Sequence, residues 1–420
     1  MERYATPRLA GALALSGAAW LGGIVTGRLE ALLLCVPFLV AAAAAALERP
    51  GAEMPEVGVV LDTPSCLERE EVTATITVTA RSSTPDVLVG LRLPPGSVAA
   101  GGEPVRRVAL TAHEPESVQI AFEAGRWGVH EFRHVPLRVY GRGRFFYRET
   151  EVETPATLRV YPAFETTRRA VTPPRLQAYA GNYASRAGGE GIEFAEVRKF
   201  TAGDRTRRIN WRVSSRRQEL YVDVAHQERN ADVILFIDSF ERIGRPGWTS
   251  LDLSVRVAAA LARHYLGHRD RVGLVTFGGM VHWLTATGGN RQLERILDYL
   301  LRVEAAASYA WKDVDTLPGR TLPPRSLVIA LSPLVDPRAL GAIRDLRGRG
   351  FPVVVVDVLA EEDVPAGDSA EDRLAHRVWR LYREAVRAEL AGHGARITRW
   401  TGREDLEASL VRLPHGRMRA

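Results

Sequence analysis

The sequence predicts a multidomain protein in which a two-helix transmembrane hairpin precedes an all-β sandwich and then an α/β domain. Three patterns support this fold class: two long uncharged runs at the start, short alternating segments after them, and continuous apolar strands separated by helical stretches. At 420 residues the chain is long enough for several separate cores. The predicted boundaries are 1–50 for the hairpin, 55–162 for the sandwich, 163–230 for a linker and a charged segment, and 231–415 for the α/β domain.

The two uncharged runs predict a pair of membrane-spanning helices. The first extends from Leu9 to Gly27 and the second from Ala31 to Leu47, so we expect helices at about 9–27 and 31–47. Each run approaches the ~20 residues that cross a bilayer core. A cleaved signal peptide is the alternative, but its apolar region spans only about 7–15 residues and no second run should follow it. The hairpin is therefore the favoured interpretation.

Two crossings return the chain to the side on which it began. Arg3 and Arg8 outweigh Glu2 before the first run, and positive charge favours the cytoplasmic side. We therefore expect a multi-pass protein of the inner or plasma membrane with its soluble domains in the cytoplasm. The two cysteines, Cys35 and Cys66, form no metal or disulfide pattern, which suits a reducing compartment.

The overall charge carries little information about partners. The formal net charge is +6, but Lys199 and Lys312 are the only lysines, and we attribute the arginine bias to a GC-rich coding sequence. No nucleic-acid-binding motif accompanies the arginines. A basic balance remains compatible with an anionic membrane surface or an acidic protein partner.

Residues 55–162 have the two-residue period of half-buried strands, as in VTATITVTA (72–80) and SVQIAFEA (117–124). About seven such strands over roughly 100 residues predict an immunoglobulin-like β-sandwich. Residues 163–190 are rich in Pro, Ala and Gly and predict a loop.

From Asp232 onward, continuous apolar strands alternate with helices. The strands are predicted at 232–238, 271–277, 326–332, 351–358 and 395–400, and the helices at 251–266, 292–303, 338–349 and 371–391. This order predicts a doubly wound, mostly parallel, Rossmann-like sheet. Ligands of such sheets bind at the carboxyl ends of the strands, which directs attention to Asp238 and Ser332.

Residues 191–217 read GIEFAEVRKFTAGDRTRRINWRVSSRR and contain eight basic and three acidic side chains. They fit a structural brace, in which Gly203-Asp204 forms a turn, Trp211 fills a core pocket and arginines pair with acids. They also fit a docking surface for an acidic partner that uses the surplus of five positive charges. The brace is favoured, because arginine suits buried ion pairs and tryptophan is rarely placed on an open surface. The candidate residues for either role are Glu193, Arg198, Gly203, Asp204, Arg207, Asn210, Trp211 and Arg216.

Asp238 lies in IDSFER after an apolar strand, and here the chain resembles the von Willebrand factor type A fold. That fold often holds Mg²⁺ through Asp-x-Ser-x-Ser, a threonine and a later aspartate. Phe240 and Arg242 stand at the two serine positions, and Ser332-Pro333 replaces the expected Ser-Asp. We therefore expect a degenerate metal site, with Asp238 and Thr316 as its remnant, no cofactor, and Asp238 salt-bridged or capping a turn.

The pattern EF…R.F..GD..R.INW..S.R resembles the signature of the bacterial family known as "domain of unknown function 58" (DUF58). The matching residues are Gly191, Glu193, Phe194, Arg198, Phe200, Gly203, Asp204, Arg207, Ile209, Asn210, Trp211, Ser214, Arg216, Leu220 and Val222. The resemblance extends over nearly the whole chain and is weaker at residues 140–143, where members usually carry a DPFGLF-like turn. It implies a membrane-anchored protein that works with a MoxR-type AAA+ ATPase on client proteins.

No enzyme is visible in the sequence. The glycines of residues 186–194 lack the Gly-Lys-Ser/Thr of a phosphate loop, and no HExxH motif or nucleophile elbow is present. The histidine pair of HYLGH (264–268) is interpreted as part of a solvated face. We expect a protein-binding adaptor or assembly factor. The alternatives are a metal-dependent adhesion protein whose soluble domains lie outside the membrane, and a hydrolase, which would need convergent polar groups near Asp238.

Overall fold

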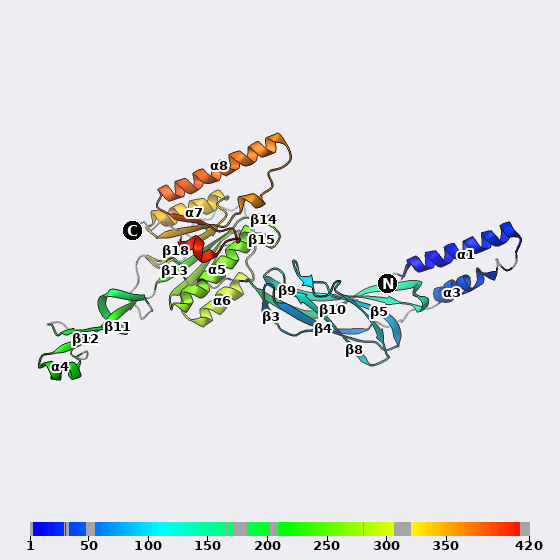
Figure 1. Cartoon of the computed structure of the whole chain (residues 1–420), viewed down its shortest axis with the longest axis horizontal. Helices are drawn as coiled ribbons and strands as arrows, with labels where there is room; N and C mark the ends of the chain where they lie inside the picture. The colour runs from blue at the N-terminus through cyan, green and yellow to red at the C-terminus, as the bar shows by residue number, and fades with distance from the viewer. Residues whose placement is uncertain are drawn as a thin grey trace. The chain divides into compact units, whose positions relative to one another are not determined.

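The chain forms two compact units, Met1–Tyr161 and Pro162–Ala420, in a computed structural model (Figure 1). The structure describes residues 3–28, 30, 33–47, 55–163, 167, 169–171, 183–201, 206, 209–229, 231–279, 281–305 and 321–411.

Two apolar helices begin the first unit. Helix α1 (Pro7–Thr26) starts with a proline in its first turn and ends at Gly27, whose φ of 64° is left-handed. Its 20 residues extend about 30 Å, and it is long and apolar enough to cross a membrane. The second predicted helix is shorter than expected: α3 (Val36–Leu47) begins at Val36, because Pro37 fits only in a first helical turn. Residues 31 and 32 lie outside the described residues.

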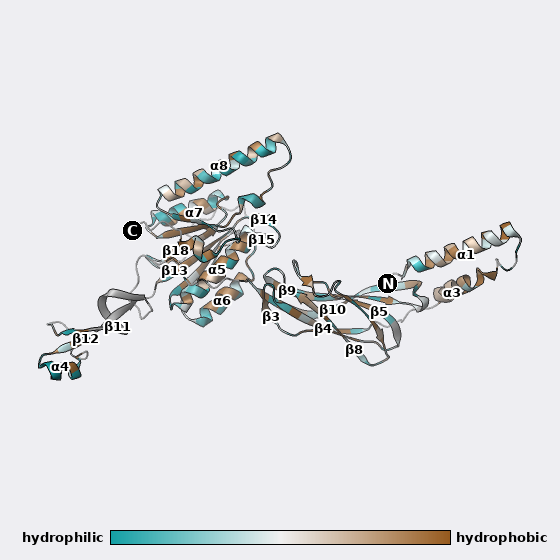
Figure 2. Cartoon of the chain, viewed as in Figure 1, coloured by the Kyte–Doolittle hydropathy of each residue, from teal (hydrophilic) through white to brown (hydrophobic). Residues whose placement is uncertain are grey.

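The two helices contact each other through small side chains and expose their large ones. The buried residues are Ala12, Ser16 and Gly23 on α1 and Ala42 and Ala45 on α3. The exposed apolar side chains include Leu13, Leu15, Leu21, Ile24, Leu39 and Val40. Figure 2 shows hydrophobic residues along both helices, coloured brown. This inversion of the usual pattern is typical of helices that pack together in lipid, where small residues allow close approach.

A short strand precedes α1 and belongs to the sheet that follows the helices in sequence. Strand β1 (Arg3–Ala5) pairs antiparallel with β10 (Phe146–Tyr161), and Tyr4 lies opposite Tyr147 with ring centroids 5.4 Å apart. The amide of Thr6 also donates to the carbonyl of Phe145 at 2.9 Å. The chain segments before α1 and after α3 are therefore held in one sheet.

Two sheets of the first unit share one hydrophobic core. The first has the order β2 (Glu56–Leu61), β4 (Glu71–Thr79), β8 (Pro115–Glu123) and β6 (Val98–Ala99). The second has the order β1, β10, β9 (Gly128–Tyr140), β5 (Thr84–Gly90) and β7 (Val105–Leu110), with β3 (Ser65–Leu67) parallel to β10. Every second residue of β4 from Val72 to Val78 is buried, as the alternating pattern predicts.

The second unit contains a six-stranded sheet. Its order is β17 (His282–Thr287), β16 (Arg271–Gly278), β13 (Asp232–Ser239), β18 (Leu327–Ser332), β19 (Val353–Asp357) and β20 (Arg396–Arg399). All neighbours are parallel except β17, which is antiparallel to β16. All residues of β13, β18 and β19 are buried, so these strands lie at the centre of the core.

Helices follow most of these strands in sequence. They are α5 (Ser250–Gly267), α6 (Asn290–Leu300), α7 (Pro337–Gly348), α8 (Ala370–Gly392) and α9 (Leu406–Val411). Helix α5 contacts β13, β16 and β18. The apolar residues of α7 and of the second half of α8 form a core cluster with alternate residues of β13, β18 and β19. The strand order reverses between β13 and β18, and crevices at the carboxyl ends of strands form at such a point.

The charged segment forms a separate two-stranded sheet. Strand β11 (Tyr183–Lys199) pairs antiparallel with β12 (Tyr221–Arg229), and helix α4 (Trp211–Arg217) lies between them in sequence. Residues 183–190, which their composition predicts as loop, are thus the first half of β11. The pairing is interrupted by register shifts near Gly188 and Gly189, where glycine weakens a strand.

Candidate functional site

Asp238 and Ser332 meet at the carboxyl ends of β13 and β18. The Ser332 hydroxyl donates to Asp238 Oδ2 at 2.6 Å, and the Phe240 amide donates to Oδ1 at 3.2 Å. Ser332 Oγ in turn accepts from the Leu334 amide at 2.9 Å. Asp238 therefore caps a turn, as one of the two predicted alternatives requires. The other alternative was wrong, because Asp238 has no ion pair among the described residues.

Burial raises the pKa of Asp238 to about 7, because desolvation penalises the charged carboxylate. The hydrogen bonds from Ser332 and Phe240 act in the opposite direction but are weaker, and the negative charges of Asp336 and Glu241 add to the upward shift. Near neutral pH this carboxyl group is therefore partly protonated.

The positively charged side chain of Arg338 lies beside this edge of the sheet. Asp336 caps the start of α7 by accepting from the Arg338 amide at 2.8 Å, and it pairs with Arg338 Nη2 at 2.7 Å. The Arg338 guanidinium lies over the Phe240 ring, 4.0 Å from its centroid. Burial alone would raise the pKa of Asp336, but the hydrogen bonds from Arg338 outweigh it and leave that pKa below its ordinary value.

These residues do not fit a magnesium site. Mg²⁺ requires near-octahedral oxygen ligands, whereas both Asp238 oxygens already accept hydrogen bonds and Phe240 and Arg242 offer no oxygen ligand from their side chains. Among the residues that the structure describes, no group of three or more His, Cys, Asp or Glu side chains could hold a metal. Thr316 lies outside the described residues.

A buried ion cluster lies next to this edge. Arg383 of α8 donates through Nη2 to both carboxylate oxygens of Asp357, at 2.8 Å each, and through Nε to Glu361 at 3.1 Å. Arg387 bridges the same two acids at 2.9 Å each. Arg383 also donates to the carbonyl of Pro333, the residue after Ser332. The cluster therefore connects α8 to the turn that holds the Asp238–Ser332 pair.

The cluster changes the titration of Glu361. Burial acts to raise the pKa of Glu361, but the hydrogen bonds from Arg387 and Arg383 and the charges of Arg399 and Arg387 lower it to about 2. Sequence reasoning missed this cluster. Its available signals were Asp357 at the end of an apolar strand, and arginines spaced three and four residues apart at positions 380, 383 and 387 of a predicted helix.

Asn210 and Ser214 attach α4 to β12. Asn210 Oδ1 accepts from the Val213 amide at 3.1 Å, and its Nδ2 donates to Asp223 at 2.7 Å. Ser214 Oγ accepts from the Tyr221 amide at 2.9 Å. Asn210 and Ser214 are four residues apart, so they lie on the same face of the helix.

The expectation that Trp211 fills a core pocket was wrong, because this side chain is 68% exposed. The reason is geometric. Asn210 and Ser214 occupy the face of α4 toward β12, and Trp211, one residue after Asn210, therefore lies on a different face of the helix. Arg212 and Arg216 are also exposed, as is Leu220. We name Trp211, Arg212, Arg216 and Leu220 the α4 surface.

The remaining candidates of this segment are only partly described. Arg198 Nη1 donates to the Lys199 carbonyl at 3.0 Å and to Thr201 Oγ1 at 3.1 Å. The backbone of Glu193 lies in β11, but its side chain is outside the described part of the chain, as are Gly203, Asp204 and Arg207 entirely. The predicted ion pairs of Glu193 and Asp204 with arginines stay predictions.

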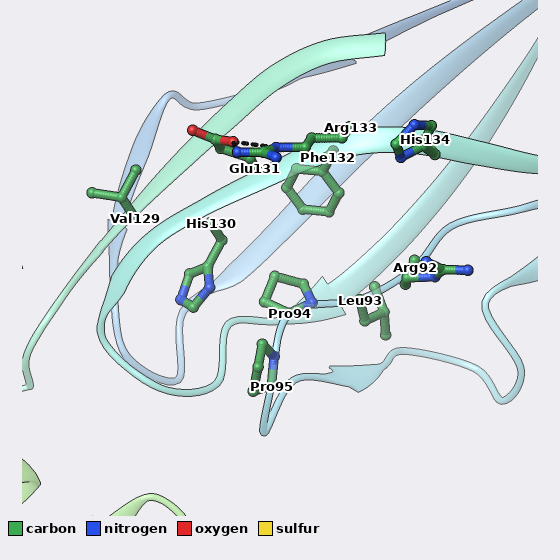
Figure 3. Close-up of a pocket in the computed structure, with 10 residues that line it drawn as sticks. All are labelled: Arg92, Leu93, Pro94, Pro95, Val129, His130, Glu131, Phe132, Arg133 and His134. Carbon is green, nitrogen blue, oxygen red and sulfur yellow. Dashed lines mark hydrogen bonds and ion pairs between the residues drawn. The ribbon is translucent and has the colours of Figure 1, made fainter. Parts of the chain in front are cut away.

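The first unit carries a separate hollow of about 460 Å³ (Figure 3). His130 and Phe132 of β9 lie on one side of it and Pro94 and Pro95 on the other. Burial lowers the pKa of His130, and its Nε2 lies 2.7 Å from the Arg126 carbonyl. The charged residues Glu131 and Arg133 pair with each other. Arg92 pairs with Glu151, outside the hollow. We assign no chemistry to this hollow, because these charged groups already have partners.

Comparison with known proteins supports the family resemblance over part of the chain. Residues 196–375 match the family model described as "Protein of unknown function DUF58". No curated protein matches the chain.

Solved structures with some likeness include a β-glucosidase, EmGH1, from Erythrobacter marinus, with 12% identity and a TM-score of 0.14 over 24% of this chain and 15% of that chain. A protein of unknown function from Porphyromonas gingivalis W83 has 16% identity and a TM-score of 0.20 over 35% and 72%. A GH20 exo-β-N-acetylglucosaminidase from Vibrio harveyi has 9% identity and a TM-score of 0.17 over 72% and 56%. The match spans 15% of the first of these chains, and TM-scores this low do not indicate a shared fold.

Replacing Asp238 by asparagine should remove a loss of stability that the wild type suffers as the pH rises. A carboxyl group whose pKa is 3.8 when unfolded and about 7 when folded stabilises the protein most below about pH 4, and this contribution is lost as the pH rises toward 7. Between pH 5 and pH 8, the free energy of unfolding should therefore fall by about 2 kcal/mol more in the wild type than in Asp238→Asn. Urea unfolding at both pH values measures it. Asp368→Asn, at an exposed carboxylate, is the control, and equal pH profiles for wild type and Asp238→Asn would refute the shift.

Removing Arg383 should destabilise the second unit strongly. Arg383→Met leaves Asp357 and Glu361 buried with an incomplete set of partners, which costs about 3–5 kcal/mol. Arg380→Met is the matched control, because Arg380 approaches the same Glu361 at 3.3 Å but is 53% exposed, and we expect it to cost at most ~1 kcal/mol. Chemical unfolding of both variants measures the difference. Equal losses would show that the buried position of Arg383 is irrelevant.

Proposed function

We propose that this chain is a membrane-anchored adaptor or assembly factor that acts by binding proteins rather than by catalysis. The observation that carries the proposal is the α4 surface, in which Trp211 and two arginines are exposed on a helix that Asn210 and Ser214 hold in place. Tryptophan and arginine are the residues most enriched where protein interfaces gain their binding energy. An exposed tryptophan on a fixed helix is more readily explained by a partner than by a brace.

The charge of the α4 surface indicates the chemistry of that partner. Arg212 and Arg216 are exposed on the same short helix as Trp211, and no acidic residue lies between Trp211 and Gln218 in the sequence. A matching protein surface would offer carboxylates around an apolar pocket. The family resemblance implies a MoxR-type AAA+ ATPase as this partner, with other proteins as clients.

The first unit supports the membrane anchor. Helix α1 is long enough to cross, and both helices expose large apolar side chains while packing through small ones. The pairing of β1 with β10 supports a return of the chain to its starting side, and therefore an even number of crossings. Helix α3 extends only about 18 Å, but it belongs to an uncharged sequence run of 17 residues that begins at Ala31. Arg3 and Arg8 favour a cytoplasmic location for both ends of the hairpin.

We further propose that the first unit contains an immunoglobulin-like sandwich and that the second is a Rossmann-like domain of the von Willebrand A type. The strand order β17-β16-β13-β18-β19-β20, which is third, second, first, fourth, fifth and sixth along the chain, supports the second assignment. A metal-dependent adhesion protein with outward domains is the weaker alternative, because Asp238 and its neighbours do not suit a cation.

The proposed anchor predicts that a thiol reagent reaches the tip of the hairpin and the sandwich from opposite sides of the membrane. In a chain with Cys35 and Cys66 replaced by alanine, Arg28→Cys should react with a membrane-impermeant maleimide on intact cells. Val60→Cys, at a position 67% exposed on β2, should react only after the membrane is opened. Labelling of both from one side would exclude the hairpin. The reverse pattern would place the soluble domains outside and favour adhesion.

The α4 surface predicts which residues capture the partner. Trp211→Ala with Arg216→Glu should weaken binding of a co-purifying AAA+ ATPase by about 30-fold or more, since a tryptophan hot spot contributes roughly 2 kcal/mol or more. Affinity purification of the full chain from native membranes measures it. Trp283→Ala, at another exposed tryptophan, is the control. Undiminished capture by the double variant, or no ATPase with the intact chain, would contradict the proposal.

A further inference from the structure

Helix α8 carries an apolar stripe on a different side from the one that it buries. The stripe residues are between 53% and 65% exposed: Leu374, Val378, Leu381 and Tyr382. The buried residues of the same helix are centred roughly a third of a turn away around its axis, and Tyr382 borders them: Arg383, Val386 and Leu390. The buried ion cluster and the core fix this orientation, so the apolar stripe faces away from its own domain.

The spacing of the stripe is that of a helix pair. Leu374, Val378, Leu381 and Ala385 are separated by four, three and four residues, which is the a/d repeat of a two-stranded coiled coil. A seam of this kind buries its side chains against a second helix. Contiguous apolar side chains on a surface indicate an interaction site.

The side chains along the two edges of the stripe identify the second helix. Arg377 and Glu384 lie on one edge, and the small Ala375 and the large Tyr382 lie on the other. The members of each pair are seven residues apart, so they occupy equivalent positions of successive heptads. Neither Arg377 nor Glu384 has an ion pair within the described residues. One edge therefore carries two side chains of opposite charge, and the other carries one small and one large side chain.

We propose that this stripe binds the same stripe of a second copy of the chain, with the two α8 helices antiparallel. Val378 then lies opposite Leu381 of the second copy, and Leu374 lies opposite Ala385. Each contact occurs twice, as two-fold symmetry requires. The apolar residues of both copies thus cover one another along the whole stripe.

The edges of the stripe match in the same register. Arg377 meets Glu384 of the second copy on one edge, and Tyr382 lies beside Ala375 on the other. Opposite charges that face each other across a helix pair set its partner and its orientation. This self-match of charge and size selects a second copy of the chain rather than an unrelated helix.

A parallel pair of α8 helices is unfavourable by charge. It would place Glu384 beside Glu389 of the second copy and Glu371, which continues the a/d spacing, directly against Glu371. The antiparallel register removes both contacts, because Glu371 then lies opposite the small Ala388 at the end of the stripe. The charges therefore select the antiparallel direction.

Charge reversal tests the self-match on the full-length chain in detergent, with the dissociation constant measured by sedimentation equilibrium. Val378→Glu with Leu381→Glu should abolish the dimer. Arg377→Glu creates two like-charge contacts and should weaken it about tenfold. Adding Glu384→Arg to that variant restores opposite charges and should return the dissociation constant to within about threefold of the wild type.

The controls separate this proposal from other causes. Val411→Glu, at an exposed apolar position on α9, should leave the dimer unchanged. Circular dichroism checks that each variant folds, and we expect folding because the substituted side chains are exposed. The proposal would be overturned if the wild type were monomeric or if the dimer survived Val378→Glu with Leu381→Glu. It would also be overturned if Arg377→Glu with Glu384→Arg dimerised as weakly as Arg377→Glu alone.

Cysteine cross-linking in native membranes tests the direction of the pair. In a chain without Cys35 and Cys66, Leu374→Cys in one copy should cross-link to Ala385→Cys in another. Leu374→Cys alone should not, because residues 374 of an antiparallel pair lie about 16 Å apart along the axis. Cross-linking of Leu374→Cys to itself would indicate a parallel pair and overturn the antiparallel register.

Discussion

The buried pairing of Arg383 with Asp357 and Glu361 is the interaction on which the second unit most depends. It joins α8 to the end of β19, and through the Pro333 carbonyl it reaches the turn after β18. A charge this deeply buried is tolerated only when its partners are complete, so the cluster specifies one position for α8. That position buries one face of the helix and leaves the apolar stripe of another face exposed.

A second constraint governs the first unit. The pairing of β1 with β10 joins the residues before the apolar helices to a sheet formed after them. This connection is compatible with the proposed hairpin. The small residues between α1 and α3 allow the close approach that such a hairpin needs, and the large apolar residues on the outside match a lipid environment.

Periodicity predicted the parts of this fold that depend on local pattern. The strand expected at 232–238 is β13, and the helix expected at 371–391 is α8. Periodicity also placed Asp238 and Ser332 at the carboxyl ends of their strands, and the observed pairing of β13 with β18 brings the two side chains together. Three features could not be predicted in this way. β1 is only three residues long and has no period, the Arg383 cluster joins segments distant in sequence, and the exposure of Trp211 depends on which face of α4 its cap uses.

The central claim is that the chain acts by binding a protein through the α4 surface. Hydrogen exchange of the full chain in detergent, with and without the co-purified ATPase, tests it most directly. We predict slower exchange in residues 210–220 on binding, with the amides of β13 and β18 unchanged because they are already fully buried. Unchanged exchange at 210–220 while another segment gains protection would contradict this assignment of the binding surface.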